Sequence, residues 1–263
     1  MKVIDSANLV LDRVSSPGIY VAVSGGKDSI ATLDLCVRKF GVKRVRCFMM
    51  YLVKDLECEW NQIRRVEKKY GIQVQAVPHW NLSRILKTGM GSVKARKDVR
   101  ELKQTDVEAY VTGDSGWWVA WGMKAADSTV RNAMLKQLRG VDAKHRRAYP
   151  IWEWKKADVY GYLRAKDLPI PQIIGGGVSG GGVGITATDL IWVRDNFPGD
   201  YKKILREFPM LEARVFRHET MGIDPIAEVK KRFSKRANKV SEKQDTNNQA
   251  ERDQASGLQP ALD

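Results

Sequence analysis

Short apolar runs alternate with amphipathic stretches along the first part of the chain. Residues 19–23, 44–52 and 72–77 are runs of apolar and β-branched side chains with the length of strands. The stretches between them space their apolar side chains for one face of a helix, and Gly41 and Gly71 follow their last turns. Strands that alternate with helices indicate βαβ units, in which the connected strands run parallel. We therefore expect an α/β fold built on a doubly wound parallel sheet.

The second part of the chain continues this alternation less regularly. Residues 81–105 interrupt the pattern, and a fourth strand at 117–121 then precedes a helix that starts at Gly122. Further on, helical stretches after residue 186 predict a small helical cap, and the polar residues after 240 predict disorder. We expect three parts, namely an α/β domain of residues 1–186, a helical subdomain of residues 187–229, and a basic, then polar, disordered tail of residues 230–263.

The first expected strand runs into a turn with two adjacent glycines and then into a helix. The turn reads Ser24-Gly25-Gly26-Lys27-Asp28-Ser29. Adjacent glycines allow positive φ and a close approach to a ligand, while a helix start and a lysine offer N–H donors and positive charge to a phosphate. A Walker A loop is excluded, because Val21 stands where its first glycine belongs and Asp28 replaces its serine or threonine. The turn instead resembles the PP-loop of the ATP pyrophosphatase, or adenine nucleotide α-hydrolase, superfamily, whose fold is of the HUP type.

A second motif follows the fourth expected strand. Gly122, Asp127, Ser128 and Arg131 match the pattern Gly-x-Arg-x-x-Glu/Asp-Ser-x-x-Arg, which is typical of phosphoadenosine-phosphosulfate (PAPS) reductases and their relatives. Lys124 stands where the pattern has its first arginine, so the charge is kept but the bidentate fork is lost. The chain therefore resembles the PAPS reductase-like branch of the superfamily.

The resemblance implies site residues in two roles. Those expected to act in catalysis are Lys27, Asp28, Lys124 and Arg131. Those expected to bind the nucleotide are Ser24, Gly25, Gly26, Lys27, Asp28, Ser29, Gly122, Asp127 and Ser128. The ligand would be ATP or a PAPS-like adenine nucleotide, accompanied by Mg²⁺. The three histidines lack metal-binding spacing, so we expect no metal site built by the protein alone.

The cysteines restrict the reaction. PAPS reduction uses a thiolate nucleophile near the C-terminus, but no cysteine follows Cys58, so true reductase activity is disfavoured. The chain also lacks cysteine pairs, and we expect no iron–sulfur cluster. The favoured reaction is cleavage of ATP to AMP and pyrophosphate with activation of an unknown acceptor. Two alternatives stay open: sulfur transfer to a nucleic acid or metabolite with a sulfur-carrying partner protein, and non-catalytic binding of a nucleotide or nucleic acid.

Charge and hydropathy limit the partners. The net charge is +14, and residues 1–227 carry most of it, which suits either a nucleotide or a nucleic acid. The basic run 230–239 is a further candidate for nucleic-acid contact. If the folded body itself binds nucleic acid, the candidate groove is formed by the basic segment 89–100 with Trp117, Trp118 and Trp121. No apolar run is long enough for a membrane span and no signal peptide is recognisable, so a cytoplasmic protein without membrane contact is expected.

Two glycine-containing segments each allow two interpretations. Residues 89–100 combine glycines with basic side chains, which fits either a solvated loop or a mobile lid over the phosphate site. The segment Gly175–Gly184 formally matches a dinucleotide fingerprint, with Asp200 further on. We discount that match because Pro169 and Pro171 break the strand that should precede it.

Overall fold

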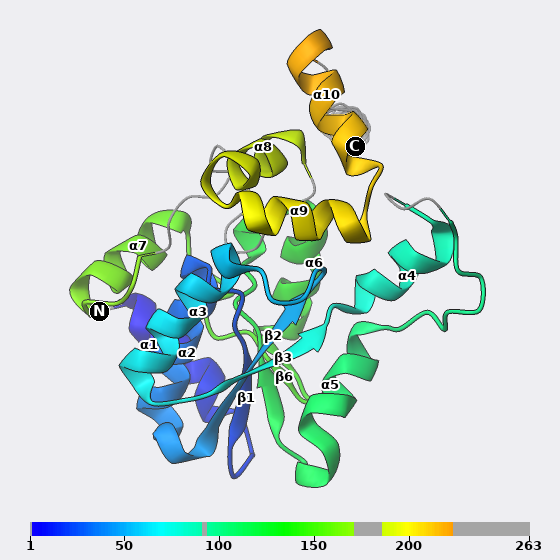
Figure 1. Cartoon of the computed structure of the whole chain (residues 1–263). Helices are drawn as coiled ribbons and strands as arrows, with labels where there is room; N and C mark the ends of the chain where they lie inside the picture. The colour runs from blue at the N-terminus through cyan, green and yellow to red at the C-terminus, as the bar shows by residue number, and fades with distance from the viewer. Residues whose placement is uncertain (1, 91–93, 171–185, 223–263) are drawn as a thin grey trace, which may run out of the picture. The chain divides into compact units, whose positions relative to one another are not determined.

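The computed structural model describes residues 2–90, 94–170 and 186–222 of the chain (Figure 1). Two compact units divide the chain, Met1–Glu212 and Ala213–Asp263, and the sheet and the candidate site belong to the first unit. The predicted tail at 230–263 and the glycine-rich segment at 175–184 lie outside the described residues. The expected domain boundaries stay a prediction.

The described residues form a six-stranded sheet with the order β3-β2-β1-β4-β6-β5. Its strands are β1 (Ile19–Ala22), β2 (Val45–Tyr51), β3 (Val74–Pro78), β4 (Trp118–Ala120), β5 (Val141–Asp142) and β6 (Arg147–Ala148). All neighbouring strands pair in parallel except β5 and β6, which are antiparallel. The predicted α/β fold is therefore confirmed as a sheet of mostly parallel strands, with an antiparallel pair at one edge.

Helices cover both faces of the sheet (Figure 1). The described helices are α1 (Lys2–Asp12), α2 (Lys27–Phe40), α3 (Glu57–Tyr70), α4 (Trp80–Thr88), α5 (Gln104–Thr112), α6 (Thr129–Leu138), α7 (Lys156–Ala165), α8 (Ala187–Asn196), α9 (Pro198–Glu207) and α10 (Leu211–Met221). Short 3₁₀ helices occur at η1 (Val42–Arg44), η2 (Gly113–Ser115) and η3 (Ala125–Asp127). One core cluster packs α1, α2, α3 and α7 against the sheet, and the other packs α5 and α6 against its opposite face.

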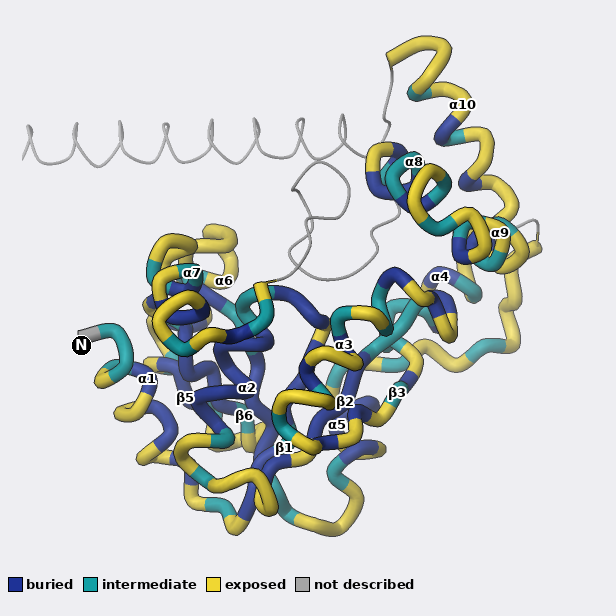
Figure 2. Tube along the Cα trace, turned by 60° about the vertical axis from the view of Figure 1, so that its left-hand side comes forward, coloured by how far each residue is buried: buried dark blue, intermediate teal, exposed yellow. Residues whose placement is uncertain are grey.

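Burial of β1 on both faces explains its continuous apolar sequence. Ile19 and Val21 belong to the core under α2, whereas Tyr20 and Ala22 face the core under α5 and α6. The dark blue trace in Figure 2 follows this strand and the adjoining helix α2 through the interior. The turn that leaves β1 is consequently held on a rigid part of the molecule.

The chain order places a switch point of the sheet beside β1. The chain proceeds from β1 outward through β2 to β3, and then returns to the other side of β1 with β4. In open α/β sheets, ligands bind outside the carboxyl ends of the strands at such a point. The two motifs identified in the sequence follow the carboxyl ends of β1 and β4, so both lie at this edge.

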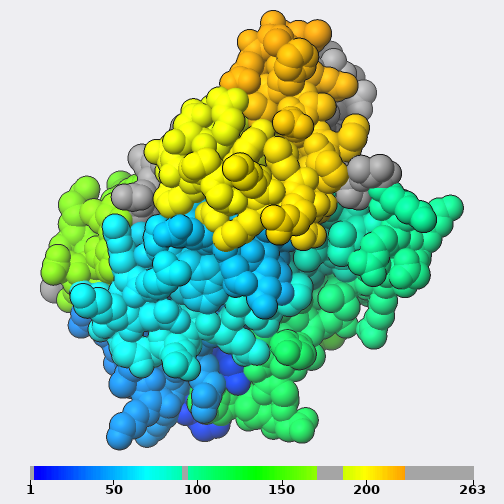
Figure 3. Space-filling view, viewed as in Figure 1, coloured from blue at the N-terminus to red at the C-terminus, as the bar shows by residue number. Residues whose placement is uncertain are grey.

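Helices α8 and α9 pack together near the N-terminal end of α3. Figure 3 shows the yellow surface of α8 and α9 adjoining the cyan surface that includes α3. The side chain of Asp200 on α9 joins the two parts, because its Oδ2 accepts a hydrogen bond of 2.8 Å from the backbone N–H of Cys58. Asp200 is therefore a structural contact in this fold.

Candidate functional site

The turn after β1 leaves the start of α2 without a side-chain cap. Gly25 has a φ of +73°, a conformation that side chains other than glycine rarely adopt. Gly26 occupies the N-cap position and Lys27 is the first residue of α2. Backbone N–H groups in a first helical turn have no carbonyl partner within the helix, and the helix dipole makes this end positive. The turn therefore presents N–H donors suited to an anion.

Ser29 fixes the shape of this turn from inside. Its buried hydroxyl donates a hydrogen bond of 2.9 Å to the carbonyl oxygen of Gly26 and accepts one of 3.2 Å from the backbone N–H of Ser24. Ser24 itself is exposed. Of the two serines predicted as ligands within this turn, Ser29 shapes the loop, and Ser24 is the one that lies at the surface.

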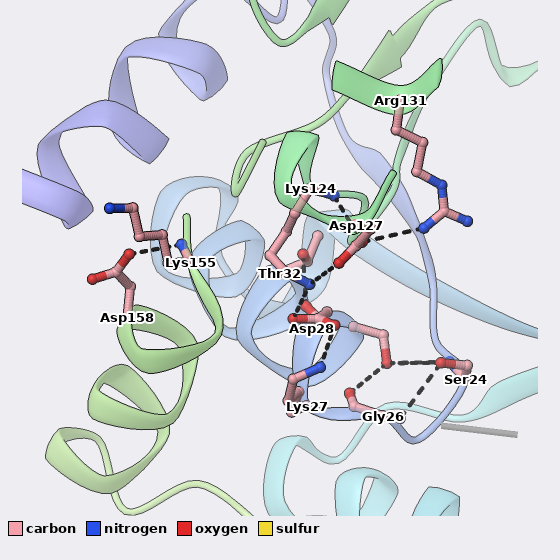
Figure 4. Close-up of polar contacts among 11 residues, drawn as sticks. Ser24, Gly26, Lys27, Asp28, Thr32, Lys124, Asp127, Arg131, Lys155 and Asp158 are labelled. Atoms are coloured by element: carbon pink, nitrogen blue, oxygen red, sulfur yellow. Dashed lines mark hydrogen bonds and ion pairs between the residues drawn. The ribbon is translucent and has the colours of Figure 1, made fainter. Parts of the chain in front are cut away.

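Four consecutive ion pairs run from the turn into the second motif, and the pair of Lys124 with Asp28 joins the two segments (Figure 4). The Nζ atom of Lys27 lies 2.7 Å from Oδ2 of Asp28, and the Nζ atom of Lys124 lies 2.8 Å from Oδ1 of the same carboxylate. Lys124 also lies 3.0 Å from Oδ1 of Asp127, whose Oδ2 is 3.1 Å from Nη1 of Arg131. We call these five residues the ion chain. It alternates in charge and has a net charge of only +1 from three basic and two acidic residues.

Gly122 brings the second motif against the turn. A Cβ atom at residue 122 would lie 2.9 Å from the carbonyl oxygen of Asp28 and 3.0 Å from the backbone nitrogen of Ser29. Contacts this short do not occur for real Cβ atoms, so a larger residue would force the two segments apart. This close packing explains why the motif has glycine at residue 122.

The acidic and hydroxyl residues of the second motif arrange its own backbone. Asp127 accepts a hydrogen bond of 3.3 Å from the backbone N–H of Lys124, and Ser128 caps α6 by accepting one of 3.2 Å from the backbone N–H of Arg131. Burial raises the pKa of Asp127, but the hydrogen bond and the ion pair with Lys124 outweigh it, so the pKa lies below its ordinary value. Asp127 is therefore held as a carboxylate.

The predicted site residues thus come together at the carboxyl edge of β1 and β4. Comparison with protein families matches residues 18–187 to the phosphoadenosine phosphosulfate reductase domain. The chain belongs to this family. The turn at residues 24–29 is the segment predicted to be its PP-loop and is called the PP-loop below, and the second motif is the segment that begins at Gly122.

Among solved structures, the chain is similar to the U34-tRNA thiolase NcsA from Methanococcus maripaludis with its 4Fe–4S cluster. The sequences are 16% identical, the match covers 80% of this chain and 79% of that chain, and the TM-score is 0.46. A search of curated proteins gave no match.

This comparison corrects one expectation. The expectation that no iron–sulfur cluster is involved is contradicted for the matched thiolase, which carries a 4Fe–4S cluster. Clusters of this type are held by several cysteine thiolates. Cys36, Cys47 and Cys58 are all buried, and no group of three His, Cys, Asp or Glu residues in the described part of the chain could hold a metal ion. The residues present therefore do not fit a cluster, and no step proposed below passes through one.

Burial also makes the three thiols of this PAPS reductase domain poor nucleophiles. It raises the pKa of Cys36, with the neighbouring Cys47 adding to the effect. It raises the pKa of Cys47 to about 12. It raises the pKa of Cys58 as well, and the Asp200 carboxylate acts in the same direction. Since the thiolate is the reactive form, these thiols are in their unreactive state near neutral pH.

One residue beside the PP-loop was not predicted from the sequence. Gln62 lies in the middle of α3, and its Cβ and Cγ atoms are 3.2 Å from the position that a Cβ atom of Gly25 would occupy. Its sequence context is an ordinary amphipathic helix next to the buried Ile63, so only the three-dimensional contact distinguishes it.

Other expected features of the site take a different form. Trp118 and Trp121 are buried, and Trp121 donates a hydrogen bond of 2.9 Å to Glu108, so these two cannot line an exposed groove with Trp117. The predicted lid at 89–100 includes residues 91–93, which lie outside the described residues, and it stays a prediction. No helix in the described ranges is long and apolar enough to cross a membrane.

Proposed function

We propose that this PAPS reductase domain binds an adenine nucleotide at the PP-loop and splits ATP between its α and β phosphates while activating an acceptor. The observation that carries the proposal is the position of the loop. It combines a left-handed Gly25, an uncapped helix start and Lys27 at the switch point between β1 and β4, with Gly122 packed directly against it. Such a site suits phosphate groups more than any other common ligand group.

In the proposed reaction the loop holds the pyrophosphate part of ATP. The N–H groups at the start of α2 and the ammonium group of Lys27 would stabilise the negative charge that develops on the leaving pyrophosphate. An acceptor oxygen forms a bond to the α-phosphorus, and the bond from that phosphorus to the α–β bridging oxygen breaks, with its electron pair leaving on pyrophosphate. The acceptor proton passes to solvent, and the AMP group stays on the acceptor until a second step releases it.

The ion chain would orient this site. Lys124 is only 2% exposed and contacts both Asp28 and Asp127, so it holds the second motif onto the first turn of α2. Arg131 is the exposed last member of the ion chain, so it is the residue of this group most available to a nucleotide. Lys27 would have to exchange its contact with Asp28 for the phosphates when the ligand binds.

Mg²⁺ fits this arrangement only together with the nucleotide. Mg²⁺ is normally held by one or two carboxylates and by the phosphates of the substrate. Asp28 is the carboxylate of the PP-loop, and it would contribute at most one such ligand group. The ion would supply neutralisation of phosphate charge, which the ion chain, at net +1, does not provide on its own.

Reductase chemistry by this chain is not part of the proposal. It requires a thiolate nucleophile, and all three cysteines are buried with raised pKa values. If the activated acceptor receives sulfur, a separate sulfur-carrying protein would have to deliver it for the same reason. The acceptor is then a metabolite or a nucleic acid whose oxygen is replaced.

The products of ATP turnover test the proposal. The purified protein incubated with ATP and Mg²⁺, with and without candidate acceptors, should form AMP and pyrophosphate, detected by ion-exchange chromatography. Lys27→Ala should reduce product formation and weaken ATP binding by about tenfold or more, because it removes a charge-assisted contact. Lys43→Ala, in the exposed 3₁₀ helix η1 that precedes β2, is the matched control and should behave as wild type. Formation of ADP and phosphate, or equal ATP affinity in both variants, would contradict the proposal.

A further inference from the structure

The side chain of Gln62 is packed against the most constrained residue of the PP-loop. Its Cβ and Cγ atoms both lie 3.2 Å from the Cβ position of Gly25, and Cδ1 of the next residue, Ile63, lies 3.8 Å from the same point. Ile63 is fully buried in the core, which fixes this turn of α3 in place. The amide group of Gln62 begins one bond beyond Cγ, so it is confined to the immediate surroundings of the loop.

The amide nitrogen of Gln62 has no hydrogen-bond partner in the described part of the chain. The Nε2 atom is buried from solvent, yet neither of its N–H groups is paired there. Leaving a buried donor unsatisfied destabilises the fold, and native proteins leave few such groups without a reason. An apolar side chain of similar size at this position would avoid that cost. An unpaired donor next to an anion-binding loop is explained if the ligand provides the acceptor.

We infer that Gln62 is a further ligand-binding residue of the site, whose Nε2 donates a hydrogen bond to a phosphate oxygen held in the PP-loop. This inference rests on the proposed function and extends it to a residue on α3. A neutral donor is useful here because the loop cations are already engaged, Lys27 with Asp28 and Lys124 with Asp28 and Asp127. The amide strengthens phosphate binding without changing the charge of the ion chain.

Two substitutions separate this role from a structural one. Gln62→Leu keeps the aliphatic stem that packs on Gly25 but removes both N–H donors. Gln62→Glu keeps the size and replaces the donors by a carboxylate, which would repel a phosphate. Asn61→Ala is the matched control, because Asn61 lies on the same helix, is exposed, and accepts a hydrogen bond from the side chain of Arg64 rather than contacting the loop through it.

The experiment is calorimetric titration of each protein with inorganic pyrophosphate and with ATP, both with Mg²⁺, alongside thermal unfolding of the free proteins. We expect Gln62→Leu to weaken pyrophosphate binding by about tenfold and Gln62→Glu to weaken it further, while the melting temperature of free Gln62→Leu stays equal to or above that of wild type. Asn61→Ala should bind as wild type does.

The outcomes distinguish this inference from the function on which it rests. If both Gln62 variants bind pyrophosphate like wild type while Lys27→Ala loses binding, the role of Gln62 is refuted and the phosphate site stands. A Gln62→Leu variant that is destabilised but keeps wild-type affinity also refutes it, because the side chain would then serve packing alone. If wild type binds neither pyrophosphate nor ATP, the proposed function is overturned together with this inference.

Discussion

Lys124 illustrates how the setting of a single residue determines its role. By its place in the motif it was expected to act in catalysis, as a positive charge facing the nucleotide. In the structure it is almost fully buried between the carboxylates of Asp28 and Asp127. A buried lysine is tolerated when it is paired, and removing its partners leaves an uncompensated charge. We therefore give Lys124 a positioning role, and its predicted catalytic role stays untested.

The pairing of Asp127 with Lys124 makes a prediction about acid stability. The folded-state pKa of Asp127 lies below its ordinary value of 3.8, so the carboxylate stabilises the fold above that value and loses this contribution as the pH falls through the folded-state pKa. The difference in unfolding free energy between wild type and Asp127→Asn should be constant above about pH 5 and shrink below about pH 4. Urea unfolding of both proteins at pH values from about 3 to about 7 measures this difference.

A surface carboxylate provides the comparison for this prediction. Asp98 is 77% exposed at its side chain and lies 3.9 Å from Arg96, so Asp98→Asn should change stability little at any pH. A wild-type to Asp127→Asn difference that did not vary with pH would show that Asp127 is not held as a stabilising carboxylate.

At the scale of elements, helix α3 depends on a cap supplied from far along the chain. Leu56 occupies its N-cap position and has no side-chain acceptor. Asp200 on α9 accepts the N–H of Cys58 instead, and Lys203 lies 3.2 Å from the same side chain. Burial raises the pKa of Asp200, but hydrogen bonds from the backbone N–H groups of Cys58 and Glu57, with other contacts, lower it by more. The pKa of Asp200 therefore lies below its ordinary value. Because α3 carries Gln62, this cap also supports the candidate site.

Removal of that cap should be measurable as lost stability. Asp200→Ala deletes a charge-assisted hydrogen bond to a buried N–H group, and we expect the free energy of unfolding to fall by about 1–3 kcal/mol. Asp195→Ala, on α8, removes an exposed carboxylate paired with Arg194 and should cost less than about 1 kcal/mol. Chemical denaturation of both variants provides the measurement. Equal losses in the two variants would argue against a capping role for Asp200.

The elements that the sequence predicted well are those with local signals. The strand β1, the PP-loop and α2 follow from an apolar run, adjacent glycines and helical spacing, and Gly41 and Gly71 end α2 and α3 as predicted. Helix α4 was missed in the interrupted region because its N-cap is His79, whose Nδ1 accepts the N–H of Asn81, rather than a typical capping residue. Strand β5 was missed because a strand of two residues is too short to show an alternation of apolar and polar side chains.

The details of the candidate site depend on contacts that no local pattern contains. The ion pair of Asp28 with Lys124 and the packing of Gln62 on Gly25 join residues from different elements of the sheet edge. The sequence could place both motifs at one edge, because the carboxyl ends of parallel strands share it. It could not show that Lys124 is buried or that an amide on α3 lacks a partner.

At the scale of the whole molecule, the positive charge is not concentrated in the ion chain. The whole protein has a net charge of +14, whereas the five residues of the ion chain together have a net charge of +1. The excess is therefore spread over other parts of the sequence. A diffuse positive surface attracts any polyanion through counterion release, and that attraction weakens strongly with salt. Binding at the PP-loop relies more on directed N–H groups in a fixed loop, which salt screens less.

Salt dependence should consequently separate the nucleotide site from nonspecific nucleic-acid binding. Titration of the 263-residue chain with Mg²⁺ and ATP, and separately with a single-stranded RNA, is repeated from about 50 to 200 mM KCl. We expect RNA affinity to fall by orders of magnitude over this range and ATP affinity to fall by only a few fold, because few charges are released at the loop. ATP should also fail to displace RNA, and Lys27→Ala should weaken ATP binding without changing the slope for RNA. A shallow salt slope for RNA combined with competition by ATP would instead place a nucleic acid at the PP-loop itself, and the nucleotide-first assignment of the site would have to be abandoned.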